Sequence, residues 1–403
     1  MTVDDLSRGR SAAYRRVLSR RDFRLLWLGS SVSLVGDGMT FVALTWLVLA
    51  QPGGVERLGL LTVCYTLPVF VGGLLSGPLL DRFDKRRVLA ADSLVRGAAM
   101  ASVPVVAAVG EVPAGLPFVV AAVYGLFKMV PLAGFPAAIP DLVPEEERDA
   151  ANALESLSFG LAGIVGPGLG GLLLAGLGGE AVLAFDALSF ALFAVAALAI
   201  RRPLPPRART GAATPGGDVL ALLRDRVLIT TTLAFMAFNI ALGMLLVAGP
   251  WLAKTQLDGG PQTLGLLLAA LSAGELAGAA LAGARAPRAR PVRAIAVVQL
   301  AAATGFLALL AAPHTIAVTA GFLVIGLFSA PMTIWAQSLR MARIPAPLRG
   351  GGFALLRTLM QATPPIGAAV VTPFLAAGML GPVAVLMTVI AAAPVLTLLR
   401  TRR

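Results

Sequence analysis

Three ionisable side chains stand deep inside apolar stretches of this sequence: Asp37, Lys128 and Glu275. Each lies 12 or 13 residues from one end of its stretch, so the three are expected at a similar depth. A charge at the centre of an apolar helix in a bilayer costs about 2.5–3.5 kcal/mol, so such residues indicate function by default. A carboxylate there can bind and release a proton or bind a cationic or polar ligand, and a lysine can pair with it. The alternatives are a structural ion pair or, for Asp37, a helix kink within G-D-G at 36–38.

The elements that carry these residues are predicted to be membrane-spanning helices. The 403 residues are 57% hydrophobic and only 13% charged, whereas a soluble chain is roughly 25% charged. Apolar runs of about 20 residues, long enough to cross a bilayer, follow one another along nearly the whole chain. This pattern excludes a soluble enzyme, a disordered chain and a nucleic-acid-binding domain. It predicts an all-α polytopic membrane protein with twelve spans: 23–50, 57–80, 88–110, 116–140, 150–177, 181–200, 227–251, 263–284, 292–311, 315–339, 349–377 and 380–399.

Lysine and arginine are distributed unevenly between the loops that join these spans. The loops on the side of the N-terminus carry 27 of them, whereas the opposite loops carry 2, Arg57 and Lys254. Because cytoplasmic loops are enriched in positive charge, both termini are expected in the cytoplasm, in a multi-pass protein of the cell membrane. The net charge of +12 is therefore a topology signal, and no nucleic-acid partner is expected. The basic loops are 1–22, 81–87, 141–149, 201–226, 285–293, 340–349 and 400–403.

Side chains for covalent, redox or metal chemistry are scarce in the sequence. The chain has one cysteine, Cys64, inside an apolar run, and one histidine, His314, in a short loop. These numbers exclude a disulfide framework and a cysteine metal site, and they disfavour a histidine-centred active site. No paired carboxylate motif or metal-ligand spacing stands out either. We therefore expect a protein that is not an enzyme and that has no metal or organic cofactor.

The segment 201–226 divides the chain into two halves. It is rich in Pro, Gly and Arg and lacks helical apolar periodicity, which is typical of a linker. We expect a cytoplasmic segment 1–22, a six-helix bundle 23–200, the linker 201–226 and a second six-helix bundle 227–403. The two halves have identical residues at several positions 201 residues apart. This similarity indicates a duplicated six-span unit, a feature of transporters. The matching pairs are Arg148 and Arg349, Ala153-Leu154 and Ala354-Leu355, Gly166 and Gly367, and Leu174-Ala175 and Leu375-Ala376.

A charged motif, G-P-L-L-D-R-F-D-K-R-R, follows the second span at 77–87. Its first glycine, Gly77, is expected to permit a close helix approach, and Asp81 lies where the helix meets the cytoplasm. The motif resembles the hallmark of the major facilitator superfamily, G-x-L-x-D-R-x-G-R-K, with Asp84 in place of the usual second glycine. The resemblance covers essentially the whole chain and implies a latch that holds the two halves together in the outward-facing state. The alternative is a plain basic turn. The residues that match the motif are Gly77, Leu79, Asp81, Arg82, Lys85 and Arg86.

Asp92 and Arg96 lie four residues apart in the third span, so they can pair on one helix face. Members of the superfamily often extend the latch network to this place, although a local ion pair is an equal alternative. The corresponding segment of the second half, 282–293, keeps its basic residues but has no acid, so the halves are not interchangeable. Asp186 lies nearer the outer end of span six and is given less functional weight.

The fifth span contains G-I-V-G-P-G-L-G-G at 163–171. A dinucleotide fingerprint would need a preceding strand and a βαβ unit, which are not expected here. Glycines in a membrane helix permit close backbone packing, and Pro167 adds a bend. The stretch resembles the G-P-x-x-G-G of the superfamily's antiporter motif, which is associated with exporters, although generic glycine packing is the alternative. The matching residues are Gly166, Pro167, Gly170 and Gly171.

Two short segments are similar to those of the twelve-span drug, macrolide and siderophore exporters: S-L-V-G-D-G at 33–38, near the start of span one, and the loop P-D-L-V-P at 140–144, after span four. The resemblance implies alternating access, with entry of protons driving export of a hydrophobic or amphipathic small molecule. It also implies that spans one, four, seven and ten line a central cavity, where Asp37, Lys128 and Asn239 can meet. As an aromatic residue, Trp335 is a further candidate substrate contact, with packing or membrane anchoring as the alternative. An importer of a small metabolite or sugar is the alternative. The expected partners are the substrate, protons and the lipid bilayer, and the protein is expected to be a monomer.

Overall fold

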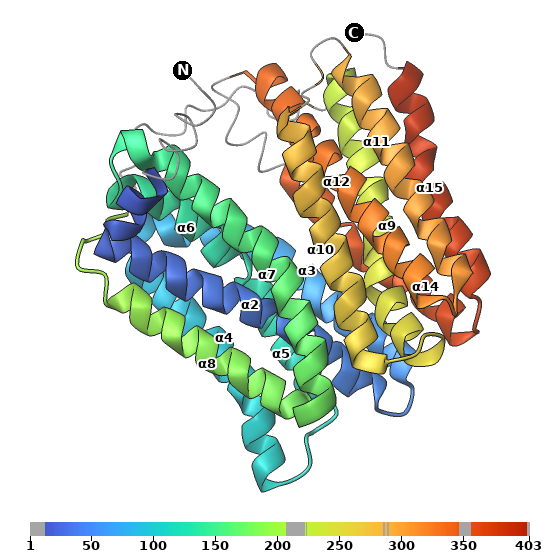
Figure 1. The fold of residues 1–403 in the computed structure, drawn as a ribbon, viewed down its shortest axis with the longest axis horizontal. Helices are drawn as coiled ribbons and strands as arrows, with labels where there is room; N and C mark the ends of the chain where they lie inside the picture. The colour runs from blue at the N-terminus through green and yellow to red at the C-terminus, as the bar shows by residue number, and fades with distance from the viewer. Residues whose placement is uncertain are drawn as a thin grey trace. The chain divides into compact units, whose positions relative to one another are not determined.

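The computed structural model describes residues 13–206, 222, 224–284, 287, 290–345 and 356–400. Twelve helices in these residues are long and apolar enough to cross a membrane (Figure 1), which confirms the predicted all-α, twelve-span fold. They are built from α2 (Arg21–Leu49), α3 (Gly54–Arg82), α4 (Lys85–Val109), α5 (Leu116–Phe127), α6 (Met129–Leu142), α7 (Arg148–Leu177), α8 (Gly179–Leu198), α9 (Arg226–Thr255), α10 (Gly260–Ala284), α11 (Pro291–Gly305), α12 (Thr315–Arg343), α14 (Pro364–Ala376) and α15 (Leu380–Arg400).

Several spans combine two helical elements. The fourth span consists of α5 and α6, which are separated only at Lys128. Pro131 explains the interruption, because it lacks the amide hydrogen that would bond the carbonyl of Phe127. The Lys128 amide still donates to the Tyr124 carbonyl at 3.0 Å, so the chain keeps its helical direction. The ninth span joins α11 to a 3₁₀ segment, Phe306–Ala311.

The chain divides into two compact units. The first unit comprises Met1–Ala43 and Val71–Arg209, and the second comprises Leu44–Phe70 and Thr210–Arg403. The units thus differ from the predicted halves at Leu44–Phe70, because this segment packs within the second unit. Lys254, for example, donates a hydrogen bond to the Leu49 carbonyl. The predicted division into segments 1–22, 23–200, 201–226 and 227–403 stays a prediction, and much of 1–22 and 201–226 lies outside the described residues.

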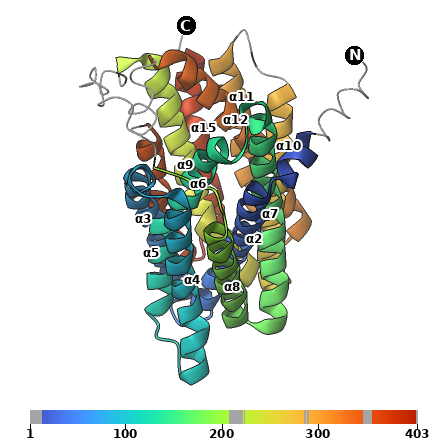
Figure 2. The ribbon, with the colours of Figure 1, turned by 90° about the vertical axis from the view of Figure 1, so that its left-hand side faces the viewer.

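In the first unit, α4 packs along α8, and both α4 and α7 contact α6 (Figure 2). One hydrophobic core cluster gathers buried side chains from these helices and from the start of α2. Its large members include Phe23, Leu89, Phe135 and Phe193. Burial of such aromatic and aliphatic side chains holds the helices in register, so the polar side chains between them have fixed neighbours.

In the second unit, α9 is the central helix. It contacts α10, α11, α12, α14 and α15. The fully buried Gln299 of α11 donates to the Ala234 carbonyl of α9 at 3.1 Å and to the Ala391 carbonyl of α15 at 2.8 Å. A buried amide needs such partners, since an unpaired polar group in an apolar interior is costly. Gln299 therefore joins three helices of this unit.

Candidate functional site

Arg96 of α4 is the centre of a buried charge cluster in the first unit. It is 1% exposed. Its Nη2 and Nε atoms lie 2.6 and 3.2 Å from Oδ2 of Asp92, and its Nη1 lies 3.4 Å from Oδ1 of Asp37. The guanidinium carbon is 4.3 Å from the ring centroid of Phe190 and 5.8 Å from that of Tyr124. Two carboxylates and two aromatic faces thus compensate the buried cation, and one of the ion pairs joins α4 to α2.

Lys128 and Asp37 belong to the same cluster. The Lys128 ammonium lies 5.9 Å from the Tyr124 ring centroid, and both Lys128 and Tyr124 interact with the Asp37 carboxylate. α4 contacts both α5 and α6, the two helices that meet at Lys128. The structure therefore brings Asp37, Lys128, Asp92 and Arg96 together within one unit. Their role in transport stays a prediction.

Asp186 of α8 is a member of the site that the sequence pattern undervalued. It is fully buried, and it accepts hydrogen bonds from the Thr40 hydroxyl and, at 2.9 Å, from the Ser189 hydroxyl. A Cβ at Gly36 would lie 2.6 Å from Ser189 Oγ and 3.0 Å from Asp186 Cγ, so a side chain at position 36 would displace the side chains of Asp186 and Ser189. With every group ionised, the cluster holds three carboxylates (Asp37, Asp92 and Asp186) and two cations (Arg96 and Lys128).

The glycine-proline stretch of α7 packs directly against α2 beside Asp37. A Cβ at Gly38 would lie 2.9 Å from both Gly166 Cα and Pro167 Cδ, and a Cβ at Gly170 would lie 2.8 Å from Met39 Cα. Gly171 is buried on the same helix. The close backbone packing expected of these residues is thus present, and it ties α7 to the residues on either side of Asp37. The association of this motif with export stays a prediction.

The charged motif at 77–87 forms two sets of contacts inside the first unit. Lys85 Nζ lies 2.9 Å from Asp141 Oδ2 and 2.6 Å from the Pro205 carbonyl, so it joins the start of α4 to the end of α6. The Arg86 guanidinium donates to the Ile200 carbonyl at 2.9 Å. The side chains of Asp81 and Arg82 are exposed and form no hydrogen bond or ion pair with the rest of the described chain.

Gly77 and Asp84 of this motif have different surroundings. A Cβ at Gly77 would meet no atom of the described residues within 4 Å, so the close helix approach expected there stays a prediction. Asp84, which stands where the superfamily usually has glycine, is the N-cap of α4: its Oδ1 accepts from the Arg86 amide at 2.9 Å. Its Oδ2 lies 2.9 Å from Arg86 Nη2. A residue read only as a departure from a motif therefore has a structural function.

The other candidate residues lie in the second unit. Glu275 is exposed on α10, and its side chain has no hydrogen-bond or ion-pair partner among the described residues. The Asn239 amide on α9 donates to the Met360 carbonyl at 3.2 Å, and the Trp335 indole on α12 donates to the Ala282 carbonyl at 3.4 Å. Asn239 and Trp335 thus bond to backbone of their own unit. The expected contact of Asn239 with Asp37 and Lys128 stays a prediction.

The comparison that decides the family is with a sequence model described as Major Facilitator Superfamily, which matches residues 26–368. The chain belongs to this superfamily. It is therefore a multi-pass membrane transporter, and the buried charge cluster lies within the matched region. The latch-like motif and the glycine-proline stretch lie there as well.

Within the superfamily, the similar curated proteins include drug exporters. The chain is 36% identical over 150 residues to the multidrug efflux pump Tap of Mycolicibacterium fortuitum, which is 36% of each protein. It is 25% identical over 185 residues to macrolide efflux protein A of Streptococcus pyogenes, which is 45% of each protein. The chain thus spans less than half the length of these two relatives. An MFS-type transporter of Sinorhizobium fredii, y4rN, is 25% identical over 374 residues, or 90% of each protein.

Solved structures of other superfamily transporters have the same fold. A peptide transporter, POT, in complex with sulfate superposes with a TM-score of 0.78 at 14% identity, over 96% of this chain and 97% of that one. The nucleoside transporter NupG gives a TM-score of 0.75 at 12% identity, over 94% and 99%. At such low identity the likeness concerns the fold alone.

Proposed function

We propose that this transporter exports hydrophobic or amphipathic small molecules by alternating access and that entry of protons drives the export. In this proposal the protein lies in the cell membrane, with both termini in the cytoplasm. Two observations support the direction: the drug and macrolide exporters among its relatives, and the glycine-proline stretch of α7. The charge asymmetry of the loops supports the orientation.

The main support for this proposal is the ion pair between Asp37 and Arg96. Arg96 holds Asp92 through two contacts of 2.6 and 3.2 Å but holds Asp37 through a single contact of 3.4 Å. Asp37 is also the more accessible carboxylate, with its side chain 16% exposed against 1% for Asp92. A proton that binds Asp37 removes its charge and weakens its attraction to Arg96, whereas the pair of Arg96 with Asp92 is retained. Asp37 is therefore the group of the cluster best suited to take up and release a proton.

The packing around Asp37 provides a route from protonation to helix movement. The ion pair joins α2 to α4, while the backbone of α2 touches α7 at Gly38 and Met39. Weakening of one contact of α2 therefore changes the balance between its two neighbours. Packed helices have discrete arrangements rather than continuous ones, so a local change can select between two states of the transporter. A cationic substrate that pairs with Asp37 would compete with the proton and couple the two fluxes.

Transport by the purified full chain in liposomes tests this proposal. The liposomes contain a pH-sensitive dye, a proton gradient is imposed, and ethidium and erythromycin are the probes. We expect proton movement that depends on the probe and that disappears in Asp37→Asn. The matched control is Asp149→Asn, which changes an exposed aspartate of α7 and is expected to transport like the wild type.

The outcomes separate coupling from transport itself. Probe flux without proton movement in the wild-type protein would overturn proton coupling. Proton-driven flux that persists unchanged in Asp37→Asn would overturn the assignment of Asp37. The variant Glu275→Gln extends the test to the second unit: loss of coupling there would place a coupling carboxylate on α10 as well.

A further inference from the structure

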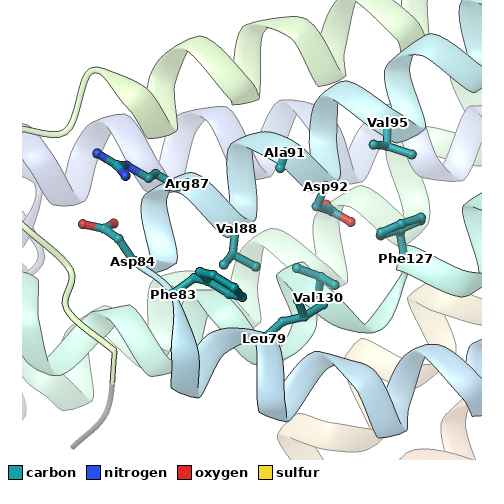
Figure 3. Close-up of a pocket in the computed structure, with 10 residues that line it drawn as sticks. All are labelled: Leu79, Phe83, Asp84, Arg87, Val88, Ala91, Asp92, Val95, Phe127 and Val130. Carbon is teal, nitrogen blue, oxygen red and sulfur yellow. The ribbon is translucent and has the colours of Figure 1, made fainter.

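A cavity opens on the first unit between the end of α3, the first half of α4 and the junction of α5 and α6 (Figure 3). Its volume is about 340 Å³, within the size range of small-molecule sites. Its wall is largely apolar and includes Phe83, Val88, Val95, Phe127 and Val130. Such a wall suits the hydrocarbon body of a ligand, and it is composed only of residues of this unit.

One wall of the cavity holds a carboxylate oxygen that lacks a partner. Asp92 lines the cavity, and in Figure 3 its carboxylate projects from α4 toward Phe127. Oδ2 of Asp92 is bound by Arg96, whereas Oδ1 is buried and has no hydrogen-bond partner in the described chain. An unpaired buried acceptor is costly, and a charged one is more so, which indicates that a donor completes this site.

The remaining charges determine which donor fits. Asp84 and Arg87 also line the cavity. Arg86 already donates to both oxygens of Asp84, and the exposed Arg87 projects beside Asp84, away from Asp92 (Figure 3). An anionic ligand would be repelled by Asp92, and a neutral hydrocarbon would leave Oδ1 unpaired. A protonated amine donates a charge-assisted hydrogen bond to Oδ1 and is attracted by the Asp92 carboxylate.

We propose that this cavity is a binding site for small lipophilic monocations. The apolar body of the ligand packs between Phe83, Phe127 and Val130, and its protonated amine donates to Oδ1 of Asp92. Because Arg96 uses the other oxygen of the same carboxylate, occupancy of the cavity does not require the ion pair of Asp92 with Arg96 to break. Binding at this site is independent of whether Asp37 couples transport to protons.

Calorimetric titration of the purified full chain in detergent tests the site. The probe is 4-phenylbutylamine, and its uncharged counterpart is 4-phenylbutan-1-ol. We expect saturable binding of the amine that is about tenfold tighter than that of the alcohol, because a hydrogen bond between charged groups is stronger than a neutral one. Asp92→Asn should reduce the affinity for the amine to that for the alcohol.

A second pair of variants keeps the test decisive if Asp92→Asn does not fold. Ala91→Phe fills the cavity from α4 and should abolish saturable binding of both probes. Leu94→Phe adds the same ring at an exposed position of α4 that does not line the cavity, and it should bind like the wild type. Equal affinities for amine and alcohol, or undiminished binding by Ala91→Phe, would overturn the proposal. No proton gradient is used, so either result leaves the transport proposal to be judged by its own assay.

Discussion

Both units of the transporter bury an arginine, but they compensate its charge in different ways. Arg96 and Arg340 are 1% and 2% exposed. The Arg96 guanidinium contacts two carboxylates, Asp92 and Asp37. Arg340 of α12 lies over the Phe235 ring at 5.2 Å and donates to the Thr231 carbonyl at 3.5 Å. No carboxylate in the described part of the chain pairs with it.

The two arginines differ in whether their described surroundings can change charge by binding a proton. Proton binding to a carboxylate changes the number of charges around Arg96, so the cluster has two electrostatic states. A backbone carbonyl and a phenyl ring do not titrate, so the surroundings of Arg340 have one state. The Nε of Arg340 is also buried without a partner in the described residues. Burial of this arginine is therefore expected to lower the free energy of unfolding.

The largest effect is therefore expected when the two arginines are replaced in parallel. Arg96→Met leaves Asp92 without its cation and Asp37 with Lys128 alone, and removal of one partner of a buried ion pair destabilises by about 3–5 kcal/mol. Arg340→Met replaces an uncompensated cation by an apolar side chain of similar length, so unfolding should occur at the same or a higher temperature. Thermal unfolding in detergent, followed by circular dichroism, measures both.

Each of the two variants can contradict the stated difference between Arg96 and Arg340. An equally large loss of stability in Arg340→Met would mean that Arg340 has an acidic partner outside the described residues. An unchanged unfolding temperature in Arg96→Met would mean that the carboxylates around it are protonated in the resting protein.

A similarity between the units gives a second, smaller test. Gly166 of α7 and Gly367 of α14 are equivalent in the internal repeat. A Cβ at Gly166 would lie 2.7 Å from the Val35 carbonyl oxygen of α2, and a Cβ at Gly367 would lie 2.9 Å from Ile240 C of α9. The fifth and eleventh spans thus approach the first and seventh spans through the same kind of contact. This geometry supports the predicted duplication.

Alanine at either glycine should destabilise the protein by about 1–3 kcal/mol, because an added methyl group overpacks a helix contact that already brings backbones together. The matched control is Gly168→Ala, since a Cβ there would meet no atom within 4 Å. Thermal unfolding of the three variants checks the prediction. A loss at Gly166 without a loss at Gly367 would show that the two contacts are not equivalent.

Local patterns in the sequence predicted the spans and the contacts between near neighbours. Apolar runs located the twelve helices, and the spacing of Asp92 and Arg96 predicted an ion pair that the structure confirms at 2.6 Å. The contacts of Arg96 with Asp37 and of Asp186 with Thr40 join residues 59 and 146 positions apart. No periodicity links such residues, because their distance depends on which helices pack together.

Arg340 illustrates a further reason why prediction fails. Its position after an apolar run places it in the basic loop 340–349, since a positive charge there usually marks a membrane surface, but it is buried in the last turn of α12. Side-chain environment, unlike helix position, is not encoded in hydropathy.

The smallest predicted effect compares the N-caps of one helix in each unit. Asp84 caps α4, and Asp225 caps α9, where its Oδ1 accepts from the amides of Val227 and Leu228 at 2.8 and 3.1 Å. Replacing an N-cap aspartate by alanine costs about 1 kcal/mol, so Asp84→Ala and Asp225→Ala should both lower the unfolding temperature slightly at pH 7. Unchanged unfolding in either variant would show that the capping bond is not significant there.

The pH dependence of the Asp84→Ala effect tests whether the charged carboxylate of Asp84 is the capping group. Burial raises the pKa of Asp84, but the hydrogen bonds to its carboxylate and the charge of Arg86 lower the pKa by a larger amount. The net pKa is therefore below its ordinary value, which is about 3.9. A carboxyl group with a lowered pKa in the folded state contributes stability above its unfolded pKa and loses that contribution as the pH falls through its folded pKa. The difference between wild type and Asp84→Ala should therefore be constant from pH 7 to about pH 5 and shrink below about pH 4. Unfolding measured across this range in one detergent tests the sign, and a difference that grows on acidification would contradict it.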